Sequence, residues 1–241
     1  MKPWARCVRG FFCVRKGGTV PLKFAFEAMK FEEVWTKQAL DAFYEDGWID
    51  EVLYRVKGGK EATVYCCKAN PATGYDLVAA KIYRHRETRS MKNYAAYQEG
   101  RFLTTDKRTL RAIKNKSRKG KAAVDSAWIR SEYTFMRTFY DAGADVPEPI
   151  DHGPHSMLMG YVGDATTAAP TLHEVRLDRA QARPLFEQIL ENVATFLAYD
   201  LVHGDLSAFN ILYWEGRDQR DRLPTGCESD GKHECLPILD A

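Results

Sequence analysis

The sequence lacks the cysteine spacing of a zinc site or of a disulfide framework. Its six cysteines stand at positions 7, 13, 66, 67, 227 and 235, and none of them forms a Cys-x-x-Cys pair. The sequence also lacks an apolar run near the ~20 residues that a membrane helix needs, and the apolar stretch 11–14 is too short for the core of a secretory signal. We therefore expect reduced thiols in a cytoplasmic protein with no membrane contact.

The chain carries almost no net charge, because 35 Lys and Arg face 33 Asp and Glu, which leaves +2. The chain as a whole is therefore not a polyanion binder. Of its 241 residues, 45% are hydrophobic and 28% are charged, which are ordinary globular values. This composition excludes an intrinsically disordered chain, and the length allows one or two domains.

The first third of the chain predicts a helix followed by a small sheet. Apolar residues recur at a helical period from Phe31, and Gly47 is a plausible stop. Three β-prone runs follow, separated by a pair of glycines and by the turn-forming stretch 70–74. We expect a three-stranded antiparallel sheet built from residues 53–56, 62–69 and 75–83.

The rest of the chain predicts longer helices. Residues 126–142 have an amphipathic pattern, with Ser126 as the cap and Gly143 as the stop. The apolar stretch 157–162 suits a buried strand, and residues 178–200 form a second long helix with one buried face. A sheet with one helix followed by a mainly helical region indicates two lobes.

A basic segment separates the sheet from the first of these helices. Between Arg84 and Lys121 there are thirteen Lys or Arg against three Asp or Glu. Such a segment is usually a solvated, mobile loop, and the alternative is a docking site for an acidic or nucleic-acid partner.

The most informative stretch is Leu201–Leu212, where a His, an Asp and an Asn lie between apolar flanks. The residues His203, Asp205 and Asn210 match the pattern H-x-D-x-x-x-x-N of a kinase catalytic loop. Phosphoryl transfer needs an Asp to accept the hydroxyl proton and an Asn to hold magnesium, and one loop supplies both. The alternative is structural: Asp205 caps a turn and His203 fills a core.

Two further features come in the chain order that a kinase requires. Lys81, in Val78-Ala79-Ala80-Lys81, lies on the third expected strand, where a kinase lysine binds the α- and β-phosphates. Glu132, in the helix that follows, is placed to pair with that lysine. The glycines before the second strand occupy the position of the loop that covers the phosphates, although they do not spell G-x-G-x-x-G.

Several of these stretches resemble the RIO family of atypical serine/threonine protein kinases, whose loop reads G-K-E-A/S-x-V-Y. The matching stretches are Gly59-Lys60-Glu61-Ala62-Thr63-Val64-Tyr65, Ala80-Lys81-Ile82-Tyr83, Pro147-Glu148-Pro149-Ile150, Leu158-Met159-Gly160-Tyr161-Val162-Gly163-Asp164, and Asp205-Leu206-Ser207 with Asn210. The resemblance spans roughly residues 50–214.

The resemblance implies phosphorylation of protein Ser/Thr, or ATP hydrolysis, with ATP and Mg²⁺ as cofactors. Lys81, Glu132, Gly59 and Val64 would bind the nucleotide, Asp205 would be the catalytic base and Asn210 a metal ligand. Residues 160–162 would form the hinge against adenine. The basic segment resembles the family's flexible loop, which by analogy is a docking or autophosphorylation region. Its positive charge is the reason to expect an RNA or ribosomal partner besides the protein substrate.

The implied fold is α+β, a two-lobed protein-kinase-like fold with an antiparallel-sheet N-lobe and a mainly helical, incomplete C-lobe. We divide the chain into an N-terminal extension 1–30, a helical lead-in 31–57, a kinase N-lobe 58–163 with the basic flexible loop 84–121, a partial C-lobe 164–216 and a divergent tail 217–241.

Two other functions compete with this interpretation. His203-Gly204-Asp205 is also the signature of small-molecule phosphotransferases of the aminoglycoside and choline kinase type, but those usually continue with His-Pro and lack the Gly-Lys-Glu loop. The second alternative is a catalytically dead remnant that binds nucleic acid or ribosomes through the basic segment, and its binding would weaken steeply with salt.

The tail departs from the family pattern after Gly216. There the family reaches a strand ending in Ile-Asp-Phe-Pro-Gln, whose Asp is the second magnesium ligand, whereas residues 217–226 are polar and lack a period. Codons compatible with residues 217–239 can be read from their second base as Gly-Thr-Ser-Val-Ile-Asp-Phe-Pro-Gln. We therefore hypothesise a frameshift near residue 217, with Asp240 as a weaker substitute for the missing ligand.

Overall fold

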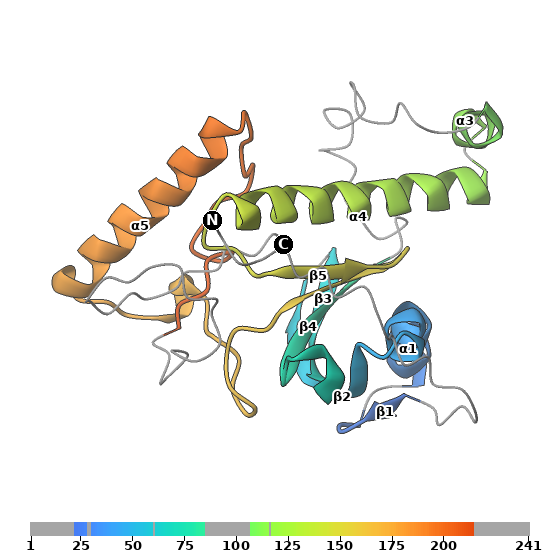
Figure 1. Cartoon of the computed structure of the whole chain (residues 1–241), viewed down its shortest axis with the longest axis horizontal. Coiled ribbons are helices and arrows are strands. Elements are labelled where there is room, and N and C mark those ends of the chain that lie inside the picture. Colours follow the sequence, from blue (N-terminus) through green and yellow to red (C-terminus); the bar gives the residue numbers. More distant parts are fainter. Residues whose placement is uncertain (1–21, 28–29, 60, 85–106, 116, 215–241) are drawn as a thin grey trace.

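The computed structural model describes residues 22–27, 30–59, 61–84, 107–115 and 117–214, and its centre is a six-stranded sheet (Figure 1). The strands are β1 (Lys23–Phe24), β2 (Ile49–Gly58), β3 (Ala62–Ala69), β4 (Leu77–Tyr83), β5 (Pro149–His152) and β6 (Ser156–Gly160). Their order across the sheet is β1-β2-β3-β4-β6-β5.

The three strands expected from the sequence form the middle of this sheet as β2, β3 and β4, which pair antiparallel. The sheet as a whole is mixed, because the additional strand β1, which was not expected from the sequence, pairs with β2 in parallel. The sheet is also wider than three strands, since β6 pairs with β4 and β5 lies outside β6. The buried strand expected at 157–162 is confirmed as β6, which begins and ends slightly earlier.

The described helices are α1 (Lys30–Glu45), α3 (Lys107–Lys114), α4 (Arg118–Asp141) and α5 (Arg179–Ala198), with 3-10 turns η1 (Pro71–Thr73) and η4 (Leu172–Glu174). The predicted stop of α1 is confirmed: Gly47 has φ +77°, a conformation that glycine adopts without the strain of a side chain. The hairpin turn at 70–74 is confirmed as well, because Asn70 caps η1 and Gly74 has φ +83°.

The prediction for α4 was wrong at its start. Ser117 rather than Ser126 is the cap, and its Oγ accepts a hydrogen bond from the Gly120 N–H at 3.2 Å. The helix therefore begins inside the basic segment and Glu132 lies in its second half. The described part of the expected loop 84–121 is helical, in α3 and the first turn of α4, while residues 85–106 lie outside the described part of the chain.

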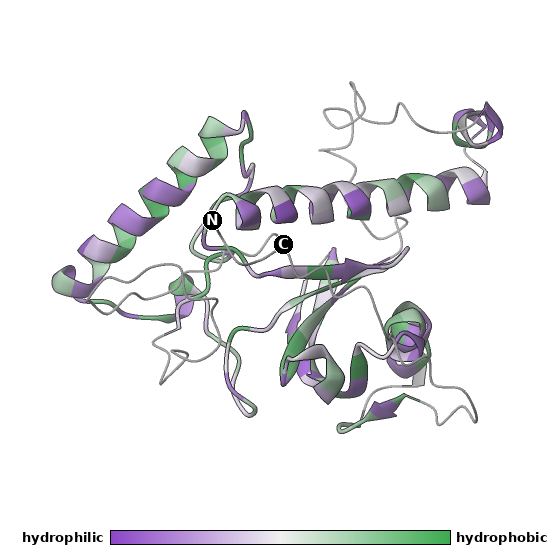
Figure 2. Ribbon diagram, viewed as in Figure 1, coloured by the Kyte–Doolittle hydropathy of each residue, from purple (hydrophilic) through white to green (hydrophobic). Residues whose placement is uncertain are grey.

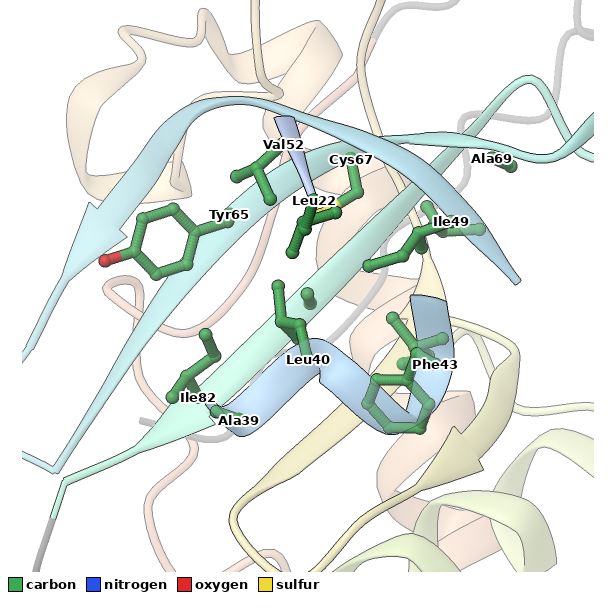
Figure 3. Close-up of a cluster of buried hydrophobic side chains, with 13 residues drawn as sticks. Leu22, Ala39, Leu40, Phe43, Ile49, Val52, Tyr65, Cys67, Ala69 and Ile82 are labelled. Atoms are coloured by element: carbon green, nitrogen blue, oxygen red, sulfur yellow. The ribbon is translucent and has the colours of Figure 1, made fainter. Parts of the chain in front are cut away.

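Successive side chains along a strand point to opposite faces of the sheet, so each face has a hydrophobic core of its own. Tyr65 and Cys67 of β3 face α1 and join its Leu40 and Phe43 (Figure 3). Ala62 of β3 faces the other way and packs with residues of α4, which crosses the sheet (Figure 1). The central strands are thus covered on both faces and hold their side chains rigidly.

The second part of the molecule is attached at the C-terminal end of α4, where the rings of Phe139 and Phe196 lie 4.1 Å apart between α4 and α5. α5 has a mixed surface (Figure 2), and its apolar residues Phe186, Leu190 and Leu197 are exposed. No helix in the described part of the chain has the length and apolar character needed to cross a membrane.

Candidate active site

Lys81 and Glu132 form a buried ion pair between the sheet and α4. The Lys81 Nζ lies 2.5 Å from the Glu132 Oε1, and the two side chains are 3% and 9% exposed. A buried ammonium needs a partner because leaving water is costly, and Glu132 supplies it. The pairing that the sequence suggested is therefore formed, with Lys81 held by β4 in a single place.

Asp205 and Asn210 form a second pair in the loop after α5. Asn210 is buried, and its Nδ2 donates hydrogen bonds to the Asp205 backbone oxygen at 2.8 Å and to the Asp205 Oδ2 at 2.9 Å. The Oδ1 of Asn210 takes no part in these two bonds. The Asp205 carboxylate itself is exposed, so it is accessible to a reactant.

Local backbone geometry presents Asp205 in this way. Gly204 has φ +79°, which lets the chain turn sharply before the carboxylate. The Asp205 N–H donates a hydrogen bond to the Nδ1 of His203 at 3.3 Å. His203 therefore orders the turn, and it does so from a half-buried position beside the ring of Phe196, 6.3 Å away between centroids.

The segment 170–174 holds the loop from the other side through backbone hydrogen bonds. The Leu172 N–H donates to the Ile211 carbonyl at 2.8 Å, and the His173 N–H donates to the Ala208 carbonyl at 2.9 Å. Sequence reasoning missed this support, because hydrogen bonds between backbone groups leave no requirement on side-chain type.

The turn that contains Gly58 and Gly59, here called the glycine turn, lies between β2 and β3, and Val64 follows it on β3. The Gly59 N–H donates to the Ala62 carbonyl at 2.8 Å, and a Cβ on Gly59 would lie 3.3 Å from that oxygen. Val64 is paired in register with Lys81 on β4. Directly opposed residues of neighbouring strands point to the same face, so Val64 and Lys81 lie side by side.

One lysine that sequence reasoning missed joins the sheet to the loop of Asp205. Lys57, at the end of β2, donates a hydrogen bond from its Nζ to the Phe209 carbonyl at 2.9 Å. Lys57 is paired with Val64, which is paired with Lys81, so two inter-strand spacings, about 10 Å, separate the backbones of the two lysines. The Lys81–Glu132 and Asp205–Asn210 pairs are therefore neighbours across this contact.

A tyrosine pair joins β2 to the segment expected as the hinge. The hydroxyl oxygens of Tyr54 and Tyr161 lie 2.6 Å apart, and the Tyr54 hydroxyl also donates to the Asp164 carbonyl at 3.4 Å. Burial raises the pKa of Tyr161 far above its usual range. Both hydroxyls therefore stay protonated at neutral pH and act as hydrogen-bonding groups.

Cysteine chemistry does not fit this site. Cys66 is buried beside Tyr54, and burial raises the pKa of its thiol to about 11, against an ordinary value of 9.0. Burial raises the pKa of the Cys67 thiol as well. The reactive thiolate form is therefore scarce at neutral pH, which excludes these two cysteines as nucleophiles.

The donor groups suit a nucleotide with a magnesium ion better than a transition metal. The described residues contain no group of three or more His, Cys, Asp or Glu that could hold a metal ion. They do offer an ammonium for phosphate and the oxygens of Asp205 and Asn210, which are the ligand type that Mg²⁺ takes. The tail in which the sequence predicts a frameshift, with Asp240, lies outside the described residues.

Comparison with known proteins gives a consistent result. The family model described as "RIO domain" matches residues 63–219. A serine/threonine-protein kinase RIO1 of Chaetomium thermophilum is 30% identical over 178 residues, which cover 70% of this chain and 33% of the relative. A RIO-type serine/threonine-protein kinase Rio1 of Haloferax volcanii is 31% identical over 198 residues, which cover 80% of this chain and 61% of the relative. The matched part thus spans less than two thirds of either relative.

Solved structures agree with the fold. The Rio2 kinase of Chaetomium thermophilum, described as an ADP/Mg²⁺-phosphoaspartate complex, superposes with a TM-score of 0.53 at 19% identity, covering 90% of this chain and 56% of that one. Another structure of the same kinase gives a TM-score of 0.50 at 21% identity, covering 86% and 53%. At these identities the likeness establishes the α+β kinase-like fold alone.

Proposed function

Because the chain belongs to the RIO domain family, we propose that it transfers the terminal phosphoryl group of ATP to a serine or threonine hydroxyl of a protein. The observation that carries this proposal is the arrangement of the two side-chain pairs, Lys81 with Glu132 and Asp205 with Asn210, on the two sides of the Lys57–Phe209 contact. Relatives that are named serine/threonine-protein kinases support the protein acceptor.

In this proposal each side chain has a defined task. Asp205 accepts the proton of the substrate hydroxyl while the hydroxyl oxygen forms its bond to phosphorus and the bond to the departing ADP oxygen breaks. Asn210 holds Asp205 in place through its amide nitrogen. Lys81, positioned by Glu132, binds phosphate oxygens, and the backbone of the Gly59 turn covers them next to Val64.

The proposed cofactors are ATP and Mg²⁺, supported by the ADP/Mg²⁺ complex of the similar Rio2 kinase. When bound, Mg²⁺ supplies positive charge to the phosphates. Asn210 would offer it the amide oxygen Oδ1, which takes no part in the hydrogen bonds to Asp205. The cytoplasmic location and the division into lobes stay predictions from the sequence.

The test compares Asp205→Asn with the control Asp200→Asn in phosphoryl transfer from labelled ATP. Both positions are exposed, and Asp200 has φ 55°, a conformation that asparagine tolerates well. We expect Asp205→Asn to lower the transfer rate by about 10²-fold or more, because the proton acceptor is lost. Asp200→Asn should stay within about twofold of the unaltered chain, because ordinary surface substitutions cost little. Equal rates in the two variants would remove the assignment.

The same assay separates the first alternative, since labelled phosphate appears on protein acceptors in one case and on aminoglycosides or choline in the other. The small-molecule interpretation gains no support from the relatives, which carry protein-kinase names.

A second candidate function rests on the basic helices. Seven exposed Lys and Arg side chains lie on α3 and the first turn of α4, without an acidic residue between them: Lys107, Arg108, Arg111, Lys114, Arg118, Lys119 and Lys121. Such a surface suits a phosphate backbone, so an RNA or ribosomal partner is the second proposal. The affinity of the chain for RNA should fall by at least tenfold between about 50 and 200 mM salt. Salt-independent binding would contradict it.

A further inference from the structure

The hydrogen bond from the Lys57 side chain to the Phe209 backbone links the glycine turn to the loop that carries Asp205 and Asn210, the catalytic loop of the proposed function. It joins positions 152 residues apart, with the Nζ at 2.9 Å from a backbone carbonyl. Lys57 stands immediately before Gly58 and Gly59, and Phe209 immediately before Asn210. The ammonium is therefore bonded to the residue that directly precedes Asn210 in the chain.

The register of the sheet brings this ammonium to the same side as Lys81. Lys57 is opposite Val64, and Val64 is opposite Lys81. Lys81 is deeply buried and bound to Glu132, whereas Lys57 is only half buried. Of the two cations, Lys57 is thus the one at the catalytic loop, where a phosphoryl group must lie in order to be transferred.

Electrostatics on the loop side agree with this location. The pKa of Glu174 is lowered, mainly by hydrogen bonds from the backbone and side chain of Thr171 and to a smaller extent by the charge of Lys57. Glu174 belongs to η4, the turn whose His173 N–H bonds the loop at Ala208. The charge of Lys57 therefore acts on the groups around the loop.

The bond that Lys57 makes here is exchangeable. Its acceptor is a neutral carbonyl, and the bond between the two groups is exposed to water. A phosphate oxygen is a stronger acceptor for an ammonium, because the hydrogen bond is then between two charges. An incoming phosphate can therefore replace the Phe209 carbonyl without a change in the sheet.

We propose that Lys57 is a second phosphate-binding residue, whose ammonium group binds the terminal phosphate of a nucleoside triphosphate. This inference rests on the proposed function and adds to it: Lys81 binds the inner phosphates, and Lys57 distinguishes a triphosphate from a diphosphate. Because Lys57 and Gly58 are adjacent on β2, the bound terminal phosphate would lie next to the glycine turn.

The test is equilibrium titration of the full chain with fluorescent mant-ATP and mant-ADP, with and without MgCl₂. The variants are Lys57→Met, Lys57→Arg and the control Lys68→Met, which removes an exposed lysine from β3 away from the glycine turn. We expect Lys57→Met to weaken mant-ATP about tenfold and mant-ADP less than about twofold, since one charge-assisted hydrogen bond is lost. Lys57→Arg should keep most of the affinity, and Lys68→Met should change neither.

The outcomes separate this inference from the function on which it rests. If the unaltered chain binds mant-ATP and Lys57→Met binds it equally well, Lys57 is not a phosphate ligand while the proposed function stands. An equal loss for mant-ATP and mant-ADP would show that Lys57 only supports the structure of the turn, which also overturns the inference. If the unaltered chain binds neither nucleotide, both proposals fail.

Discussion

The ion pair of Lys81 and Glu132 contributes to the stability of the fold and also positions the lysine that we propose to bind phosphate. Both groups are almost wholly withdrawn from water, and the Nζ and Oε1 lie 2.5 Å apart. Removing one partner leaves the other charge buried without compensation, which costs about 3–5 kcal/mol in comparable buried pairs. Lys81, which we propose to bind phosphate, thus also contributes to the stability of the fold.

A double-mutant cycle tests this. We predict that Lys81→Met and Glu132→Leu each lower the free energy of unfolding by about 3 kcal/mol, because each removes the partner of a buried charge. The double variant should lose less than either single variant, since two apolar side chains replace the pair. Urea denaturation measures all four chains, and simple addition of the two single effects would contradict the interaction.

The packing of α3 on α4 depends on one glycine. A Cβ on Gly120 would lie 2.2 Å from the Ala112 backbone oxygen, far inside contact distance. Ser117 closes the same corner, because its Oγ donates to the Ala112 carbonyl at 3.1 Å. The two helices that carry the basic surface can therefore approach closely only because this position has no side chain.

Gly120→Ala separates helix propensity from packing. Alanine in an exposed helix would raise stability by roughly 0.5–1 kcal/mol over glycine. Here we predict the opposite sign, a loss of about 1–3 kcal/mol in the protection of α3, because the added methyl group collides with backbone. Hydrogen exchange of α3 amides measures the effect. The control Lys119→Ala, at an exposed neighbouring position, should leave α3 protected, and equal exchange in both variants would refute the packing argument.

The two parts of the molecule are joined by a polar cluster next to the Phe139–Phe196 contact. Asn192 of α5 is 3% exposed and accepts a hydrogen bond from the Asp145 N–H at 2.7 Å. Its Nδ2 donates to the Asp145 Oδ2 at 2.8 Å, and Gln188 donates to the same oxygen at 2.9 Å. This cluster fixes α5 to the turn after α4, and so fixes the distance between Glu132 and the loop of Asp205.

Asn192→Ala should therefore loosen the whole arrangement. We predict a loss of about 2 kcal/mol in the free energy of unfolding, because the half-buried Asp145 loses the hydrogen bonds that Asn192 makes with its N–H and its carboxylate. Faster amide exchange in α5 should accompany it, with the sheet unaffected. Glu191→Ala, at the exposed neighbouring position of the same helix, is the control. If the two variants have the same stability, the cluster does not hold the two parts together.

Local patterns in the chain were sufficient to predict most of the individual elements, and they singled out the residues that the structure brings together as the Lys81–Glu132 and Asp205–Asn210 pairs. The periodicity from Phe31, the turn residues of 70–74 and the spacing of Asp205 and Asn210 act over a few positions, so their physical requirements can be read in order. The start of α4 was missed because its cap, Ser117, stands within a run of charges that resembles a loop.

Several contacts between residues far apart in the sequence could not be predicted from the sequence and were found only in the tertiary structure. The parallel pairing of β1, the bridge from Lys57 to Phe209 and the cluster around Asn192 each join segments far apart in the sequence. Such contacts depend on backbone groups or on ordinary polar side chains whose counterpart no local pattern specifies. The sequence by itself thus determined which residue types are present for the proposed phosphate chemistry. The distances between them are set by the tertiary structure, in which α4 packs on the sheet and α5 packs on the end of α4.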